Sequence, residues 1–388
     1  MGLVDQIHQE TVVSHPALVL IEHQILLVLL LCPQVYKVFD SLFKLMPLDV
    51  FSDEAEDVVQ EKQIGDTYTT TKGMDEKNQS MVTEFLLLGF GNLHNFRIVI
   101  FIFFLIIHIM ALTSNIFVLV LVGVTRSLHS PMYFFLSQLS MSEILFTSNI
   151  VPNMLWLILV GEGRLPVSRC LSQFYLMSVP SISQCFLLAA MSFDRHAAIC
   201  RPLHYATIMT FTHELQMVAS CWLLGFTFPL PVYIFLNKLE FCCRYVINHF
   251  FCDIAPLLLL SCSSTSAVEL VTAVVSFPVL LTPFIFIVVT YISIIRTILK
   301  IRSSVGRHKA FSTCSSHLII VCMYYGTLTS IYIFPPRDNS IDLNKSLSVL
   351  YTLVTPLFNP LIYSLRNQDI RGAIGKYVQV LKMRQKSQ

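Results

Sequence analysis

Asp194 and Arg195 stand side by side in the stretch MSFDRHAAICRPLHY, at the end of a long apolar segment. The chemistry that this pair offers is electrostatic, because neighbouring opposite charges form an ion pair that a conformational change can make or break. Two charges at a helix end also have a simpler explanation, since such side chains reach out to a membrane interface. The choice between a latch and an interfacial pair therefore depends on the elements around them.

Glu143 is a second ionisable group, and it lies inside another apolar stretch, SQLSMSEILF. A carboxylate inside a membrane is costly, which makes it a candidate functional group by default. Burial favours its neutral form, whereas a bound cation or a hydrogen-bond donor favours the charged form. Asn115 and Asn359 are plausible partners. A hydrogen bond that merely joins two helices is as well supported as a conformational role.

Four cysteines, Cys170, Cys242, Cys252 and Cys262, fall in connections on one predicted side of the membrane. Their grouping favours disulfides over free thiols. A metal site of His249, Cys252 and Asp253 is disfavoured, because a bridged cysteine has no thiolate to offer. We therefore predict no metal and no cofactor. Five further cysteines are predicted to be packing residues in or near the spans: Cys185, Cys200, Cys221, Cys314 and Cys322.

The elements that position these groups follow from composition. Hydrophobic residues make up 54% of the 388 residues and charged residues 13%, so the apolar surplus must face lipid. Bilayer-spanning segments of this length satisfy their backbone hydrogen bonds as helices. We predict an all-α membrane protein, a seven-transmembrane helix bundle. Its spans are predicted at residues 98–122, 132–160, 171–199, 215–236, 267–294, 310–334 and 346–365.

Lys and Arg set the predicted orientation. They are more numerous on the side that holds Arg195, which indicates that this side is cytoplasmic, with the N terminus extracellular and the C terminus inside. Asn78 begins an N-x-S motif on the outer side, so it is a predicted glycosylation site. The expected location is the plasma membrane, as a multi-pass protein.

Four regions are predicted along the chain. Residues 1–73 are an N-terminal extension, poorly ordered or a gene-model artefact, and residues 74–97 are an extracellular segment. Residues 98–366 form the seven-transmembrane domain. Residues 367–388 alternate charged and apolar side chains, which predicts a short amphipathic helix after the seventh span and a cytoplasmic tail. Before that helix, Asn359 and Pro360 predict a bend, because proline removes a helical hydrogen bond and asparagine can occupy the freed backbone.

Several function classes are disfavoured. Neither H-E-x-x-H nor G-x-S-x-G occurs, so the chain is not expected to be an enzyme. A transporter or channel is disfavoured because there is no internal repeat and no polar path through several spans. The net charge of +2, without a basic cluster, predicts no nucleic-acid partner.

The motifs LHSPMYFFLSQLS, MSFDRHAAICRPLHY, KAFSTCSSHL and PLFNPLIYSLRN together resemble the olfactory receptors, a branch of the rhodopsin-like G-protein-coupled receptors. The likeness runs from about Met74 to the C terminus. It implies an odorant receptor that binds a small, mostly apolar volatile and activates a heterotrimeric G protein of the stimulatory, cAMP-raising type. A receptor of the same fold for a non-odour lipid or metabolite is the alternative.

The resemblance also implies roles for single residues. Cys170 would bridge to Cys252 and leave Cys242 with Cys262. Arg195 would be held by Asp194 at rest, and Tyr291 and Tyr363 would settle near it in the active state. The segment from Lys309 to His317 would swing outward to open the G-protein cleft. The implied ligand set spans four helices: Met177, Ser178, Ser181, Ile182, Cys185, Val275, Val279, Leu328, Thr329, Tyr332, Val349 and Thr352.

This lining is mostly apolar, with a few hydroxyls and no formal charge, which predicts that carboxylic acids and amines are poor agonists. Plain helix packing would explain the same stripe of residues. The chain departs from the family pattern at four positions. His196 replaces a tyrosine after Asp-Arg, Ser114 replaces a glycine, Glu143 replaces an aspartate, and Pro180 is expected to interrupt the third span.

Overall fold

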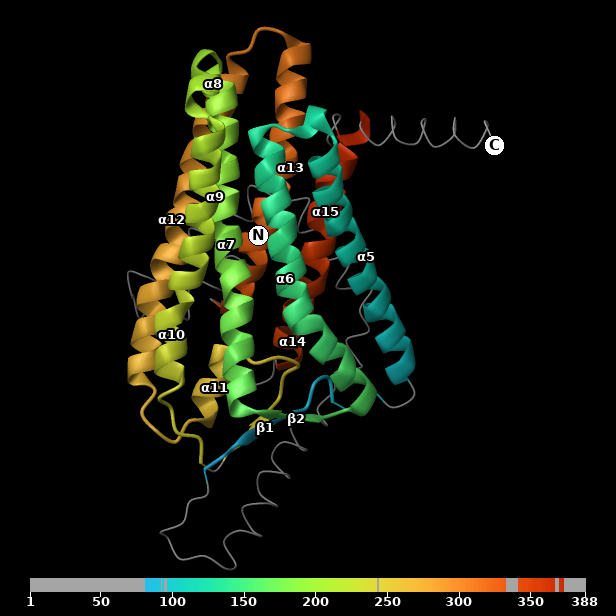
Figure 1. Cartoon of the computed structure of the whole chain (residues 1–388), viewed down its shortest axis with the longest axis vertical. Coiled ribbons are helices and arrows are strands. Elements are labelled where there is room, and N and C mark those ends of the chain that lie inside the picture. The colour runs from blue at the N-terminus through green and yellow to red at the C-terminus, as the bar shows by residue number, and fades with distance from the viewer. Residues whose placement is uncertain are drawn as a thin grey trace, which may run out of the picture.

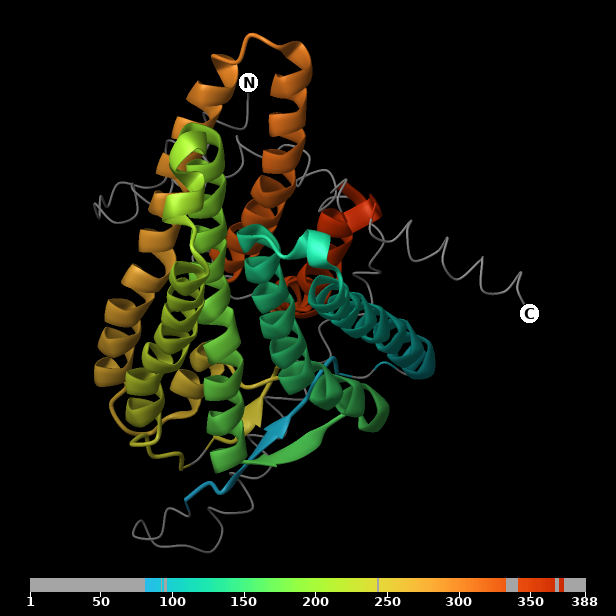
Figure 2. The same ribbon diagram turned by 45° about the horizontal axis from the view of Figure 1, so that its top comes forward.

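The computed structural model describes residues 81–91, 93, 96–242, 244–332, 341–366 and 370–372. These residues form a bundle of seven membrane-length helical segments that run side by side (Figures 1 and 2). The predicted fold class is confirmed. The segments are α5 (Arg97–Val124), α6 (Pro131–Val160), α7 (Val167–Cys200), α9 with α10 (Phe211–Thr227 and Pro229–Leu236), α12 (Ser266–Leu299), α13 (Ser304–Tyr332), and α14, η5 and α15 (Ile341–Val349, Leu350–Val354 and Thr355–Arg366).

Shorter elements close the two ends of the bundle. One end, called the Arg195 end here, carries η3 (Arg126–Leu128), η4 (Pro202–His204) and α8 (Tyr205–Ile208). The opposite end, called the disulfide end, carries α11 (Ile254–Leu260) and the strands β1 (Glu84–Leu87), β2 (Gly163–Pro166) and β3 (Val246–Ile247). In Figure 1 the Arg195 end is at the top and the strands lie at the bottom.

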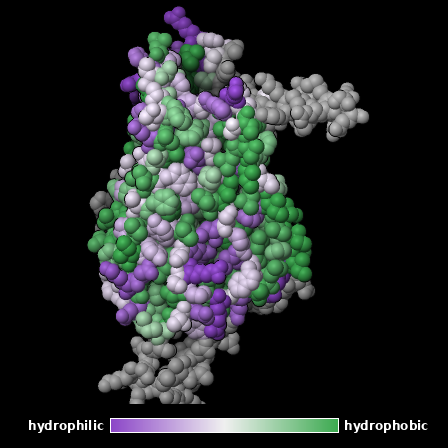
Figure 3. Space-filling view, viewed as in Figure 1, coloured by the Kyte–Doolittle hydropathy of each residue, from purple (hydrophilic) through white to green (hydrophobic). Residues whose placement is uncertain are grey.

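The outside of the bundle is apolar. Six of the described helical segments are long and apolar enough to cross a membrane, and aliphatic side chains such as Ile98, Ile102 and Ile106 on α5 are exposed. Figure 3 shows hydrophobic side chains over the flank where α5 lies. Water would not tolerate so large an apolar surface. The chain is therefore a multi-pass membrane protein.

Helix α7 occupies the middle of the bundle, where it packs against α6, α9, α10, α12 and α13. Its contact with α9 is close because Gly225 has no side chain. A Cβ at Gly225 would lie 2.0 Å from the Oγ of Ser183 and 2.8 Å from the carbonyl oxygen of Val179. Any larger residue would push α9 away from α7.

Prolines act differently from one helix to another. The fourth span divides at Phe228, because Pro229 has no N–H to continue the α9 ladder and starts α10 instead. Pro180 was expected to interrupt the third span, but α7 runs unbroken from Val167 to Cys200 with Pro180 inside it. That expectation was wrong, since the helix tolerates the loss of one hydrogen bond when its neighbours hold it in place.

The seventh span also differs from its prediction. Pro360 lies inside α15, and the departure from α-helical geometry comes earlier, as the π-helical turn η5. The amide of Asn359 does not serve the freed backbone, because it donates to Glu143 of α6. The bend expected at Asn359 and Pro360 stays a prediction, whereas the expected use of Asn359 to serve the freed backbone is not seen.

A three-stranded sheet at the disulfide end was not predicted. β1 pairs antiparallel with β2, with Leu87 opposite Gly163, and parallel with β3, with Leu86 opposite Val246. The segment that precedes α5 is thereby joined to two connections far away in the sequence. The side chains of Phe85 and Leu87, both on β1, are buried.

Some predictions lie outside the described residues. They are the extension 1–73, the glycosylation site Asn78, the side chain of Tyr332, and, apart from residues 370–372, the helix and tail predicted at 367–388.

Candidate functional site

The ion pair at the Arg195 end has a third member. The Nε of Arg195 donates to Oδ2 of Asp194 at 2.8 Å, and its Nη2 contacts the same oxygen. The hydroxyl of Tyr205, on α8, donates to Oδ1 of Asp194 at 2.7 Å. Burial, and then the charge of Asp194, raise the pKa of Tyr205, so it stays a donor. Both carboxylate oxygens of the fully buried Asp194 are thus occupied.

Two hydroxyl contacts tie α7 to α12 beside the ion pair. The hydroxyls of Ser192 and Thr290 are hydrogen-bonded to each other, and Nε2 of His196 lies 3.2 Å from the hydroxyl of Ser293. His196, the residue that replaces the family's tyrosine, therefore faces a neighbouring helix. These contacts are single hydrogen bonds between side chains, so a small movement of α12 would break them.

The hydroxyls of Tyr291 and Tyr363 have hydrogen-bond partners other than Arg195. The hydroxyl of Tyr291 lies 2.7 Å from Nδ1 of His317 on α13, and it also donates to the carbonyl of Cys314 at 3.3 Å. The hydroxyl of Tyr363 donates to the sulfur of Met191 at 3.9 Å. Arg195 is paired with Asp194.

Glu143 has one of its two expected partners. The amide nitrogen of Asn359 donates to Oε1 of Glu143, and this bond links α15 to α6. Asn115 was expected to contact the carboxylate, but its amide donates to the carbonyl oxygens of Ala111, at 2.9 Å, and Pro356, at 3.0 Å. That partnership was wrong, because Asn115 satisfies the backbone of its own helix and of α15.

A hydroxyl cluster joins three helices in the interior, and we define it as Ser181 of α7, Tyr324 of α13 and Tyr351 of η5. The hydroxyl of Ser181 is hydrogen-bonded to that of Tyr351 and lies 3.3 Å from that of Tyr324. The hydroxyl of Tyr324 also donates to the backbone carbonyl of Ser181 at 2.5 Å. The sulfur of Cys185 lies 3.5 Å from the same hydroxyl. Both tyrosines are buried.

The structure brings Ser181 and Cys185 of the predicted ligand set to this cluster. The hydroxyls of Ser178 and Thr352 instead donate to carbonyls of their own helices, those of Phe174 and Ser348. Four of the predicted aliphatic and thioether side chains are buried, namely Met177, Val279, Leu328 and Val349, and Ile182 is partly buried. Val275 and Thr329 are also partly buried. A cavity of about 520 Å³ lies elsewhere, between α7, α9 and α12, and none of the predicted ligand residues lines it.

Two disulfides cross the disulfide end, Cys170–Cys252 and Cys242–Cys262. These are the pairings that the resemblance implies. The first ties the start of α7 to the long connection between α10 and α12, and the second closes a loop within that connection. The amide N–H of Cys252 also donates to the side-chain oxygen of Gln173 at 3.1 Å.

A buried cation accompanies the disulfides. The side chain of Lys345, on α14, is 1% exposed, and its Nζ donates to Oδ1 of Asn248 at 2.6 Å. The neighbouring His249 is also buried, with its ring against those of Phe250 and Phe251. Burial, and then the charge of Lys345, lower the pKa of His249 to about 3. His249 is therefore neutral at physiological pH.

Sequence reasoning missed Tyr324, Tyr351, Tyr205 and Lys345. Tyr324 precedes the predicted Leu328 by four residues, so helical spacing could have found it. Tyr351 could not be found in this way, because the π-helical turn η5 buries four consecutive residues, Leu350 to Leu353. Lys345 fell just outside the predicted seventh span, 346–365, whereas α14 begins earlier, at Ile341, and includes it.

Comparisons with known proteins agree on one family. A family model described as olfactory receptor matches residues 104–381. Human olfactory receptor 6Q1 is 44% identical over 303 residues, which are 77% of this chain and 95% of that relative. Mouse olfactory receptor 5P68 is 42% identical over 301 residues, 78% of this chain and 96% of that relative. The crystal structure of squid rhodopsin superimposes with a TM-score of 0.55 at 19% identity, covering 71% of this chain and 78% of that one, and supports the fold alone.

Proposed function

Because this chain belongs to the olfactory receptor family, we propose that it detects a small, mostly apolar volatile within its bundle and signals through the stimulatory, cAMP-raising G protein. The chain is a receptor of the plasma membrane, not an enzyme. The observation that carries the proposal is the hydroxyl cluster, three polar groups from three helices that meet among apolar side chains. A ligand that replaces one of their hydrogen bonds would change how α7, α13 and η5 are held together.

The cluster favours ligands with one or two hydrogen-bonding groups, such as alcohols, aldehydes and esters. Its hydroxyls can both donate and accept but carry no charge. An ammonium would need a buried anion, and the buried cation Lys345, at the disulfide end, would repel it. Carboxylates are also disfavoured, because none of the three cluster residues carries a positive charge that could balance a buried carboxylate.

We place the disulfide end outside the cell. Disulfides persist in an oxidising compartment, and the excess of Lys and Arg is on the Arg195 side. In this orientation Asp194, Arg195 and Tyr205 face the G protein. Release of Arg195 from Asp194 and the approach of Tyr291 and Tyr363 would then follow the outward movement of α13.

The test is a cAMP measurement in cells that express the full chain, with a panel of volatiles and with surface expression measured in parallel. Arg195→Ala is expected to abolish the response while leaving surface expression intact. A volatile response that survives this change unaltered would overturn the role of Arg195. Responses confined to acids or amines would overturn the proposed ligand class.

The role of the cluster has its own matched pair of variants. Tyr351→Phe removes one cluster hydroxyl, and loss of such a hydrogen bond is expected to raise the half-maximal concentration of an active alcohol about tenfold. Tyr175→Phe is the control, because this hydroxyl of α7 donates to the carbonyl of Phe226 and lies outside the cluster. Equal shifts in both variants would show that the cluster does not recognise the ligand.

A further inference from the structure

A groove lies on the membrane face of the bundle, at the cavity between α7, α9 and α12. Its volume of about 520 Å³ falls within the range of small-molecule sites. Side chains beside its mouth, such as Leu215 and Leu223 on α9 and Ile285 and Val289 on α12, are exposed on the surface that faces lipid. Whatever occupies the groove must therefore come from the bilayer.

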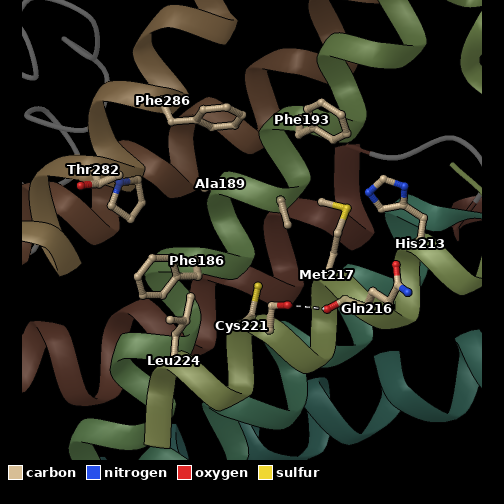
Figure 4. A pocket seen from close by; sticks show the side chains of 13 residues that line it. Phe186, Ala189, Phe193, His213, Gln216, Met217, Cys221, Leu224, Thr282 and Phe286 are labelled. Atoms are coloured by element: carbon tan, nitrogen blue, oxygen red, sulfur yellow. Dashed lines mark hydrogen bonds between the residues drawn. The ribbon is translucent and has the colours of Figure 1, made fainter. Parts of the chain in front are cut away.

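The walls of the groove are flat and aromatic. Rings of Phe186 and Phe193 from α7 and of Phe286 from α12 surround it, with the small Ala189 between them (Figure 4). Phe193 and Phe286 lie with ring centroids 6.5 Å apart. Alanines at 189 and 190 leave the space that a larger side chain would fill. Such walls suit a rigid, flat apolar body, which loses little conformational entropy when it is held.

The polar groups of the groove lie mostly along one helix. His213, Gln216 and Ser220 recur on α9 at helical spacing, beginning in the first turn of that helix at the Arg195 end. The hydroxyl of Ser220 already donates to the carbonyl of Gln216, at 2.8 Å. The exposed side chains of His213 and Gln216 remain to bind a polar group near the membrane surface.

The lining residues include no Lys, Arg, Asp or Glu. A phosphate headgroup would normally be bound by a cationic side chain, so the groove does not suit a phospholipid head. A neutral lipid with a single hydroxyl and a rigid fused-ring body fits both the polar end and the aromatic walls. We propose that this groove binds a membrane sterol, with its hydroxyl at His213 and Gln216 and its rings between Phe186, Phe193 and Phe286.

Occupancy would act on the contact between α7 and α12. Ser192, next to Phe193, is hydrogen-bonded to Thr290, whose hydroxyl also donates to the carbonyl of Phe286. A sterol against both rings would hold these two helices together at the Arg195 end. The inference does not depend on which volatile the receptor detects.

The test is photolabelling of the full chain, purified into phosphatidylcholine nanodiscs, with a diazirine derivative of cholesterol. Labelled peptides are expected from α7, α9 and α12 around the groove, with competition by unlabelled cholesterol. Ala189→Phe fills the groove, and is expected to reduce labelling about tenfold. Ala219→Phe is the control, because Ala219 is exposed on α9 but does not line the groove.

A second variant guards against misfolding. Ser220→Trp adds bulk at an exposed rim position of α9, and should also reduce labelling about tenfold while the melting temperature without sterol stays that of the wild type. Gln216→Leu should weaken labelling by cholesterol more than labelling by its 3-epimer. Labelling that Ala189→Phe and Ser220→Trp leave unchanged would overturn the proposal. So would preferential labelling of the groove by a diazirine phospholipid, or crosslinking of the groove to a second receptor copy.

Discussion

The two ends of the bundle are held by different kinds of bond. At the disulfide end, Cys170–Cys252 and Cys242–Cys262 join segments covalently, and β1 pairs with both β2 and β3. At the Arg195 end, the contacts that the structure describes between helices are hydrogen bonds of single side chains, such as His196 with Ser293 and Tyr291 with His317. The first end is built to keep its shape, and the second can exchange partners.

This difference suits a receptor. A ligand must be received in a site of fixed shape, whereas a signal requires a second region with two accessible arrangements. The hydroxyl cluster of Ser181, Tyr324 and Tyr351 lies between the two regions and touches three helices. Variants at either end can therefore test this difference between the two ends.

The largest effect is expected from Cys170→Ser. The bridge to Cys252 closes a separation of 82 residues, and loss of a bridge over so long a loop costs about 4 kcal/mol. Surface expression, measured by flow cytometry, should fall to near background. Cys200→Ser is the control, because Cys200 is a free cysteine at the other end and serine can replace its contact with Thr297. Equal loss of surface expression in both variants would contradict the proposed difference between the two ends.

An intermediate effect is expected from acidification at the disulfide end. The pKa of His249 is lowered to about 3 in the folded chain, whereas the unfolded chain takes up the proton near pH 6.5. The unfolded state therefore binds more protons, and stability falls as the pH drops below about 6.5. Between pH 7 and pH 5 this group contributes a loss of about 2 kcal/mol.

His249→Gln should therefore lose less stability over the same range, measured as the apparent melting temperature of purified protein. His204→Gln is the matched control, because His204 is exposed in η4. If His249→Gln and the wild type melt in parallel from pH 7 to pH 5, the histidine is not buried in a neutral state.

The smallest effect is expected from Tyr205→Phe at the Arg195 end. This change removes one donor from the carboxylate of Asp194, and a hydrogen bond to a charged group contributes about 1.5 kcal/mol. Loss of this bond would weaken the tie between Asp194 of α7 and α8. Basal cAMP should therefore rise, by up to about tenfold, without loss of surface expression. Unchanged basal cAMP would show that Tyr205 does not help to keep Asp194 and Arg195 in the resting arrangement.

The sequence predicted the spans because their apolar length is a strong, local signal, and four motifs together, one of them with Asp194 and Arg195, carried the resemblance to the family. It could not predict the sheet, because β1 and β3 come together only through the tertiary fold. Nor could α-helical periodicity identify Tyr351, since the π-helical turn η5 changes which side chains face inward. The burial of Lys345 was not predicted, because the span was taken to begin at residue 346 and a buried lysine is exceptional.

The central claim is that the Arg195 end moves while the disulfide end does not. Spin labels introduced as non-canonical amino acids at Arg126 and Arg307 would report on the first end, and labels at Arg164 and Lys238 on the second, all four being exposed. Distances would be measured by pulsed electron resonance before and after addition of nucleotide-free stimulatory G protein and an active volatile. We predict a longer Arg126–Arg307 distance and an unchanged Arg164–Lys238 distance. A change confined to the disulfide end, or equal changes at both ends, would contradict the account.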